Sequence, residues 1–204
     1  MARKTGVTKD TLHHIILDAG VVYLNWGSSD PLNPPMKLGA TRGGSTYHVE
    51  SERRDMPLDG ITGIARGGAR FLGVTVELTT NLVEITKEIL TRAIPGATID
   101  TGTVAVNELG EVIPTENHYT ISRRLEQTIP DITYNDIAIV AEVSNTKAPI
   151  ICGLKSGIAG GGLELSFADG DESVLAVTFT GTIDPLDPDE EPWFIIYPEA
   201  LPTP

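Results

Sequence analysis

The sequence predicts a mainly β protein with one α-helix and one long loop. Three observations lead to this fold class: most segments alternate apolar and polar side chains, a single segment has apolar side chains at helical spacing, and turn-forming residues are frequent. The 21 glycines and 14 prolines divide the 204 residues into short segments, as antiparallel sheets require.

The clearest strands are expected in the central part of the chain, residues 38–94. Residues 45–50 alternate as a strand with one wet face does, and residues 69–78 are rich in β-branched and aromatic side chains. Between them, Asp59 and Gly60 favour a tight reversal, so the two strands are expected to form a hairpin.

The single helix is expected over residues 82–93, where leucine and isoleucine repeat at helical spacing. Asn81 offers an N-cap, with Glu84 three residues later. Pro95 and Gly96 are expected to end the helix. Because no second helix is expected to meet its apolar stripe, this helix is predicted to cover a sheet.

The rest of the chain is expected to supply further strands. The alternating segments are residues 12–25 (a strand or a bent strand pair, whose first six residues could instead form a helical turn), 98–106, 118–125, 132–143, 150–154 and 193–196. Residues 163–167 and 175–179 are predicted to pair as a hairpin across a turn at Asp169 and Gly170.

We expect residues 1–204 to form one domain with three appendages. These are an N-terminal arm (residues 1–11), a long loop (residues 26–42) and a C-terminal extension (residues 183–204). The loop contains three prolines, which exclude a continuous strand, and it carries more apolar side chains than a solvated linker needs. It is therefore predicted to pack on a partner.

Composition disfavours several classes of function. With 28 acidic against 15 basic side chains, the formal net charge is −13, which disfavours non-specific binding to nucleic acid or to an anionic membrane. No apolar run reaches the roughly 20 residues of a membrane span. The one cysteine, Cys152, cannot form an internal disulfide and is expected to be a buried, unreactive thiol, so folding in a cytoplasm is expected.

No motif for catalysis, cofactor binding or metal binding is found, and the chain is not expected to be an enzyme. His13 and His14 are neighbours, which on a strand point to opposite faces, so ordinary histidines are expected rather than metal ligands. The acidic segment 184–191 could hold a cation but is expected to be a solvated connector. Two Arg-Gly-Gly segments are expected to form turns or bulges, with nucleic-acid binding as the weaker alternative.

Four segments of the chain, taken in order, resemble the major tail tube proteins of long-tailed bacteriophages, particularly those that infect Gram-positive hosts. They read GVTKDTLHHIILDAGVVYLN (residues 6–25), LGATRGGSTYHVESERRDMPLDG (38–60), VTVELTTNLVEITKEIL (74–90) and DPLDPDEEPWFIIYP (184–198). None is a chemical motif, so the resemblance lies in their order and spacing along nearly the whole chain.

The resemblance implies a β-sandwich or barrel-like tail tube fold with one flanking helix. It also implies that copies join into rings, generally of six, whose inner sheets merge and whose stacking makes a hollow tube. The implied partners are the chain itself, a tape-measure protein, a tail terminator and baseplate proteins, and DNA would pass through the lumen without specific binding. The expected location is the virion tail, after synthesis in the host cytoplasm.

Two sets of residues are candidates for these roles. The charged face of the central hairpin is expected to line the lumen, through Glu50, Glu52, Asp55 and Glu77. The long loop resembles the family's loop that reaches an adjacent subunit or ring, and its candidate contacts are Trp26, Leu32, Met36, Lys37 and Leu38. An ordinary solvated strand face is the alternative for the first set. For the whole protein, the alternatives are another tail component, such as a terminator or a baseplate hub, and a monomeric β-sandwich that binds a carbohydrate or a protein.

Overall fold

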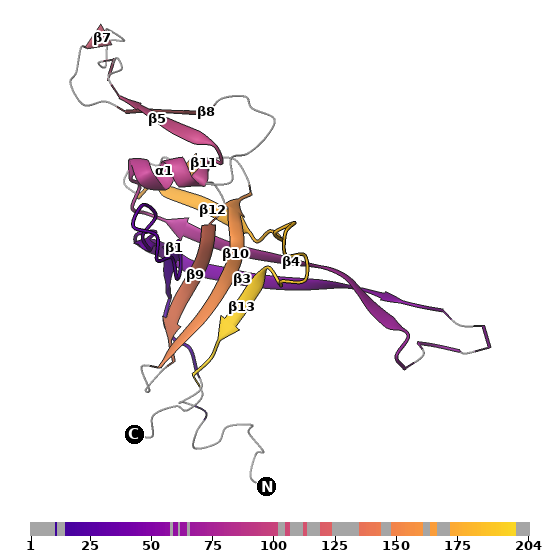
Figure 1. Ribbon diagram of the computed structural model, residues 1–204. Helices are drawn as coiled ribbons and strands as arrows, with labels where there is room; N and C mark the ends of the chain where they lie inside the picture. The colour runs from indigo at the N-terminus through magenta and orange to yellow at the C-terminus, as the bar shows by residue number, and fades with distance from the viewer. Residues whose placement is uncertain are drawn as a thin grey trace.

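Figure 1 shows a computed structural model of the protein. The structure describes residues 11, 15–57, 59–60, 62–64, 66–101, 105–106, 112–113, 119–123, 135–143, 148–160, 164–166 and 172–198. The predictions for the two neighbouring histidines, for residues 1–10 of the N-terminal arm and for the turn at Asp169 and Gly170 lie outside these residues.

The described residues form thirteen strands and one helix. In chain order these are β1 (Val21–Leu24), β2 (Met36–Lys37), β3 (Thr41–Asp55), β4 (Ala69–Leu82), α1 (Lys87–Ala93), β5 (Ala97–Thr101), β6 (Ala105–Val106), β7 (Val112–Ile113), β8 (Tyr119–Arg123), β9 (Asn135–Glu142), β10 (Pro149–Ala159), β11 (Glu164–Ser166), β12 (Val174–Thr180) and β13 (Trp193–Ile196). The prediction of a mainly β protein with one helix is confirmed.

Nine of the strands form one antiparallel sheet in the order β2-β1-β9-β10-β12-β4-β3, with β13 also paired to β10 and β11 to β12. The sheet folds over at β10, because residues 151–154 pair with β9 and β13 whereas Ile158 and Ala159 pair with β12. The register shifts between these two parts, where Ser156 has a left-handed φ of 46°. We call β2, β1, β9, β13 and the start of β10 the first layer, and the end of β10 with β12, β11, β4 and β3 the second layer.

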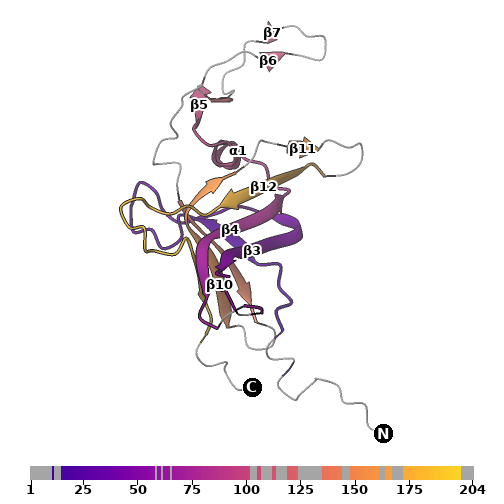
Figure 2. The same ribbon diagram turned by 90° about the vertical axis from the view of Figure 1, so that its right-hand side faces the viewer.

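The two layers pack face to face around one hydrophobic core. Strand β4 shows the reason most clearly, because Val76, Leu78 and Leu82 are fully buried while the side chains between them are not, apart from the buried Thr80 on the same face. The core also contains Val22, Leu24, Leu38, Ile137 and Leu154 from the first layer and its connections, and Leu175, Val177 and Phe179 from β12. Figure 2 shows β3 and β4 lying in front of β10. The expected sandwich is therefore one open sheet folded on itself.

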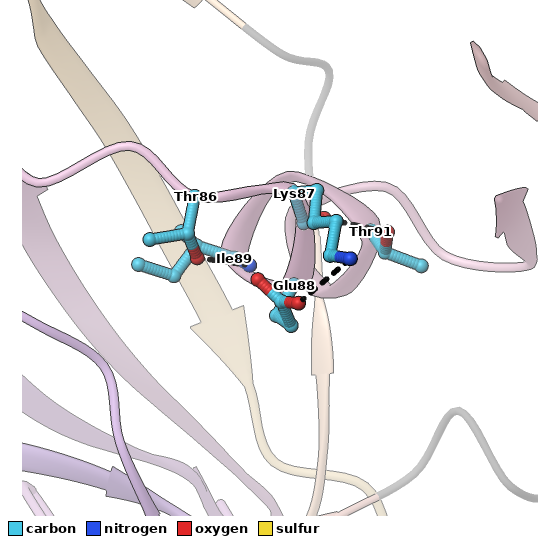
Figure 3. A network of polar contacts seen from close by, with 5 residues as sticks. All are labelled: Thr86, Lys87, Glu88, Ile89 and Thr91. Carbon is cyan, nitrogen blue, oxygen red and sulfur yellow. Dashed lines mark hydrogen bonds and ion pairs between the residues drawn. The ribbon is translucent and has the colours of Figure 1, made fainter. Parts of the chain in front are cut away.

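Helix α1 is shorter than predicted and begins later. Thr86 is the N-cap, and its Oγ1 accepts a hydrogen bond from the backbone N of Ile89 at 3.3 Å (Figure 3). The predicted start was wrong because β4 continues to Leu82, whose backbone pairs with Thr41 on one side and Leu175 on the other. The predicted end is confirmed, since the helix is capped at Ile94.

The helix closes one end of the sandwich. Ile89 and Ala93 are buried and belong to the core, so its apolar face does pack on the sheet as predicted. Its other side contacts the two-stranded sheet β5–β8, where Lys87 Nζ lies 3.9 Å from the centre of the Tyr119 ring. Figures 1 and 2 both place α1 between the sandwich and β5.

Several other strand boundaries differ from the predictions. Strands β3 and β4 have 15 and 14 residues, and residues 56–68 connect them. Asp59 and Gly60 lie in a turn of this connection, with Gly60 at φ 88°, so the predicted turn is confirmed, but the connection is longer than a tight hairpin. Of the described residues in the predicted strand 12–25, Val21–Leu24 form a strand and Ile16 forms an isolated β-bridge with Val143, and Gly20, with φ 73°, turns the chain between them. The pairing of Leu165 with Leu175 and the C-terminal strand β13 are confirmed.

Candidate functional site

The outer halves of β3 and β4 leave the sandwich as a two-stranded ribbon. We define the ribbon as residues 48–55 and 69–75 with the connection between them, and Figure 1 shows it projecting far beyond the other strands. Val49 at its base packs against the core, but farther out Phe71 is 79%, Leu72 57% and Ile64 65% exposed. Exposed apolar surface of this kind indicates a contact with another molecule.

Strand β3 is also an open sheet edge. Among the described residues it pairs with β4 alone, so one side of its backbone is unpaired over most of Thr41–Asp55. A long unpaired edge is a template for further strands, and soluble monomers usually shorten or cover such edges. This edge is neither short nor covered by a described element.

An acidic face lies on the side of the second layer that points away from the core. Tyr47 of β3 packs on the core, so Glu50 and Glu52, at odd spacings from it, point the other way. Glu77 pairs with His48 and shares this face, because directly opposed residues of neighbouring strands lie on the same side. Three of the four predicted lumen residues therefore lie together.

Asp55 lies on the other side of β3, so the structure does not bring it together with the other three residues predicted to line the lumen. Alternation places Asp55 with Ser51 and Arg53 on the opposite side of β3. Its Oδ1 lies 3.2 Å from Arg53 Nε, so this carboxylate is neutralised by an arginine of its own strand.

The acidic face contains no lysine or arginine over the described positions from Thr46 to Glu52 of β3 and their partners on β4 and β12. The other side chains there are mostly threonine, and Thr79 Oγ1 lies 3.0 Å from Thr178 Oγ1. The single imidazole, His48, has Nε2 3.8 Å from Glu50 Oε2. A polyanion near this face would meet repulsion with no fixed positive charge to hold it.

Glu164 adds a further carboxylate that the sequence analysis did not select. It pairs with Ala176 of β12, which pairs in turn with Asn81 of β4, on the same side as Glu77. The neighbouring Leu165 packs against the core, so alternation in the sequence already indicates that Glu164 points outward. The register that brings β11 to this face is a long-range feature that the local pattern does not contain.

The long loop is used partly within the chain. Leu38 is 1% exposed and donates its backbone N–H to the oxygen of Val22, and Met36 pairs with Leu24 and packs on the core. Leu38 is therefore buried within its own chain and Met36 is partly buried there, because β2 adds to β1 in the first layer.

The other three loop candidates remain accessible to different degrees. Leu32 is 88% exposed, Lys37 is exposed with Nζ 6.0 Å from the centre of the Tyr23 ring, and Trp26 is half-buried with its ring 5.4 Å from Tyr23. The accessible part of the loop is thus centred on Leu32.

The described residues include no group of three or more His, Cys, Asp or Glu side chains that could hold a metal ion. In the acidic segment, Glu190 pairs with Lys155 and Glu191 accepts a hydrogen bond from Trp193 Nε1 at 3.2 Å. Burial raises the pKa of the half-buried Cys152 thiol, which keeps it in the less reactive neutral form. Within the described part of the chain, the helix is far too short to cross a membrane.

No family model matches the chain, and no curated protein sequence matches it significantly. Among solved structures, the fold is similar to a chain from the tail of an empty gene transfer agent particle with C6 symmetry, with a TM-score of 0.41 and 9% identity over 79% of this chain and 90% of that chain. A chain from the virion of a native gene transfer agent particle gives a TM-score of 0.39 and 9% identity, over 79% and 89% of the two chains. Likeness at this level carries no conclusion about function, so the surfaces of the chain itself have to supply one.

Proposed function

We propose that this chain is a structural virion protein whose copies assemble into the tube of a phage tail, with the acidic face lining the channel through which DNA passes. The observation that carries the proposal is the open edge of β3 beside a face that has carboxylates and no lysine or arginine between Thr46 and Glu52. The order of its sequence segments, which resembles that of tail tube proteins, supports a tube as the form of this assembly.

The open edge supports assembly because backbone donors and acceptors along β3 can pair with a strand of another copy. Such pairing would extend the second layer from one copy to the next, and a closed ring of copies would leave no edge exposed. We propose rings of six, as the resemblance implies, that stack to form the tube.

The acidic face supports transport of DNA without binding. If Glu50, Glu77 and Glu164 point into the lumen, each copy contributes negative charge all around the channel wall, and phosphates slide past without a site to occupy. The role in this proposal is structural and non-catalytic. By the same resemblance, a tape-measure protein, a terminator and baseplate proteins are the other partners.

The assembly test uses the purified full chain. Size-exclusion chromatography with light scattering, followed by negative-stain microscopy, should give rings or tubes whose amount increases with concentration. A single monomeric peak at high concentration would contradict the proposal and favour a monomeric binding module.

The position of the acidic face can be tested by chemical accessibility in a Cys152→Ala background. Glu77→Cys should react with a small maleimide before and after assembly but lose its reaction with a maleimide carried on a bulky polymer once tubes form. Asp100→Cys on β5, which is exposed and far from this face, is the matched control and should react with both reagents throughout. If both cysteines, or neither of them, lose the reaction with the polymer-bound maleimide on assembly, the acidic face does not line the lumen. A reconstruction of the tube with the acidic face on the outer wall would also contradict this assignment.

The exposed part of the long loop is proposed to contact an adjacent subunit or ring through Leu32. Deleting residues 26–38 would remove core side chains, so the sharper variant is Leu32→Asp, which changes only an 88% exposed side chain. We expect folded protein that forms rings but shorter tubes. Tubes of full length would show that the loop has no such role.

A further inference from the structure

A groove of about 420 Å³ lies where the ribbon leaves the sandwich. One wall is the ribbon itself, at Phe71 and Leu72, and the other is formed by the C-terminal loop between β12 and β13, with Ile183, and by Trp193 at the start of β13. Phe71, Leu72 and Ile183 are 79%, 57% and 48% exposed, so the floor of the groove is apolar and uncovered. An apolar groove of this size is well suited to receive side chains of another molecule.

The rim of this groove is acidic. The C-terminal loop carries five carboxylates and no basic residue between Gly181 and Pro192. Glu190 and Glu191 have partners in the chain, whereas the side chains of Asp187 and Asp189 have no ion pair or hydrogen bond with any described residue. Asp189 lines the groove directly. An occupant with positive charge would therefore be favoured.

The tip of the ribbon has the opposite character. Residues 53–70 contain four arginines and two aspartates, a net charge of +2 in a chain whose total is −13. Arg54 and Arg70 stand directly opposite each other across β3 and β4. Like charges in that position destabilise a strand pair, and neither arginine forms an ion pair with a described residue. Arg54 and Arg70 therefore have no anionic partner among the described residues.

From these two surfaces we infer that the ribbon tip of one copy docks in the groove of a second copy. Arg54 and Arg70 would meet Asp187 and Asp189, while the exposed Ile64 beside the arginines would cover part of the apolar floor. This inference rests on the proposed self-assembly and names the surfaces that carry it.

The tip cannot fill the groove of its own chain without folding back. The groove is walled by Phe71 and Leu72, and the strands continue from there in the paired, extended form to Asp55 and Ala69, pointing away from the C-terminal loop (Figure 1). A second copy meets no such constraint. Because the two surfaces are different patches of one molecule, the contact is head-to-tail and can be repeated, so it produces rings or filaments rather than closed pairs.

The test is a charge exchange between two variants of the full chain. Arg54→Glu with Arg70→Glu reverses the tip, and Asp187→Arg with Asp189→Arg reverses the groove rim. Each variant alone should raise the protein concentration needed for assembly by about tenfold or more, since like charges then meet across the contact. Mixing the two variants should restore alternating assembly, because the reversed tip fits the reversed rim. Arg123→Glu on the exposed end of β8 is the control for a change of charge alone and should assemble as the wild type does.

The outcomes separate this inference from the proposed function. A wild-type chain that never assembles contradicts the proposed function and the inference together. Wild-type assembly that both reversed variants reproduce at the same concentration overturns the inference and leaves the tube proposal intact. The inference would also be overturned if only the tip variant lost assembly, the rim variant assembled normally and mixing restored nothing. The arginines would then have a different acidic partner, such as DNA phosphate. Unchanged thermal melting of both variants at low concentration controls for misfolding.

Discussion

Strands β3 and β4 run through two regions that differ in how much of their apolar surface is buried. Where they lie in the sandwich, Val76, Leu78 and Leu82 are fully buried, and apolar burial stabilises the pair. In the ribbon the same ladder continues, but Phe71 and Leu72 are 79% and 57% exposed. An isolated two-stranded ribbon is at best marginally stable in water. The comparison indicates that burial within this chain stabilises the sandwich, whereas the ribbon gains little stabilisation of this kind from the described residues.

The largest expected difference between the two regions comes from truncating one apolar side chain in each. Leu78→Ala should lower the free energy of unfolding by about 2–5 kcal/mol, because it leaves a cavity in the core. Phe71→Ala should change it by no more than about 0.5 kcal/mol, because the ring is solvated already. Urea denaturation of dilute, unassembled protein measures both.

Assembly should reverse this order of effects. Phe71→Ala is expected to weaken assembly although the monomer keeps its stability, since the ring forms a wall of the groove. A loss of monomer stability in Phe71→Ala comparable with that of Leu78→Ala would mean that the ribbon is folded against its own sandwich, and the distinction between the regions would fail.

A second contrast concerns the junction at β10. Gly153 lies under the ring of Phe194, and an added Cβ would sit 2.1 Å from Phe194 Cζ. Gly153→Ala should therefore cost about 1–3 kcal/mol through overpacking and displace β13. Gly73→Ala in the ribbon is the matched control, because an added Cβ there has no atom within 4 Å. The free energy of unfolding is measured for both variants and for Gly153→Ala combined with Phe194→Leu. If Phe194→Leu restores none of the stability that Gly153→Ala loses, the clash with the Phe194 ring is not the cause of the loss.

Local patterns in the sequence predict the parts of the fold that local physics determines. The alternation of Val76, Leu78 and Leu82 is sufficient to identify β4 and its buried face, and the aromatic and branched residues of β13 are sufficient to identify that strand. Leu82 satisfies both the strand period and the helix period, so the helix start was misplaced. The strand prevails because its pairing partners, Thr41 and Leu175, are distant in the sequence.

The candidate site was predicted in part for the same reason. Alternation places Glu50 and Glu52 on one face and, applied strictly, would have placed Asp55 on the other. Burial of Leu38 depends on β2 pairing with β1, and a strand as short as Met36–Lys37 has no alternation from which that register could be predicted. The projection of the ribbon depends on where the neighbouring strands end, which no pattern within β3 or β4 contains.

A smaller effect is expected at the end of the sandwich that α1 closes. Thr86→Ala removes the side-chain acceptor for the N–H of Ile89 and should lower the free energy of unfolding by about 1 kcal/mol. Thr86→Ser keeps the hydroxyl and should stay close to the wild type. Because the helix packs on the sandwich and not on the ribbon, neither variant should change the concentration needed for assembly. A shift in that concentration for Thr86→Ala would indicate that α1 contributes to the contact between copies.

The smallest expected effect is a change of stability at alkaline pH that depends on Tyr47, a half-buried residue of β3 that lies before the ribbon. Tyr47 donates its hydroxyl hydrogen to the oxygen of Gly153 at 2.9 Å, and burial, with a smaller contribution from Cys152, raises the pKa of Tyr47 from 10.0 to about 12. The unfolded chain then loses this proton more readily than the folded chain. The stabilisation is therefore fully present below about pH 10 and is lost as the pH rises through about 12.

Tyr47→Phe isolates this contribution from the other groups that titrate at alkaline pH. Below about pH 10 the wild type should be the more stable protein, and its advantage in the free energy of unfolding should shrink as the pH approaches 12. If the difference in the free energy of unfolding between the wild type and Tyr47→Phe stays constant over this range, the pKa of Tyr47 is not raised by burial in the folded state. Tyr47 would then behave as a ribbon residue, and the boundary between the two regions would have to move toward the base of β3.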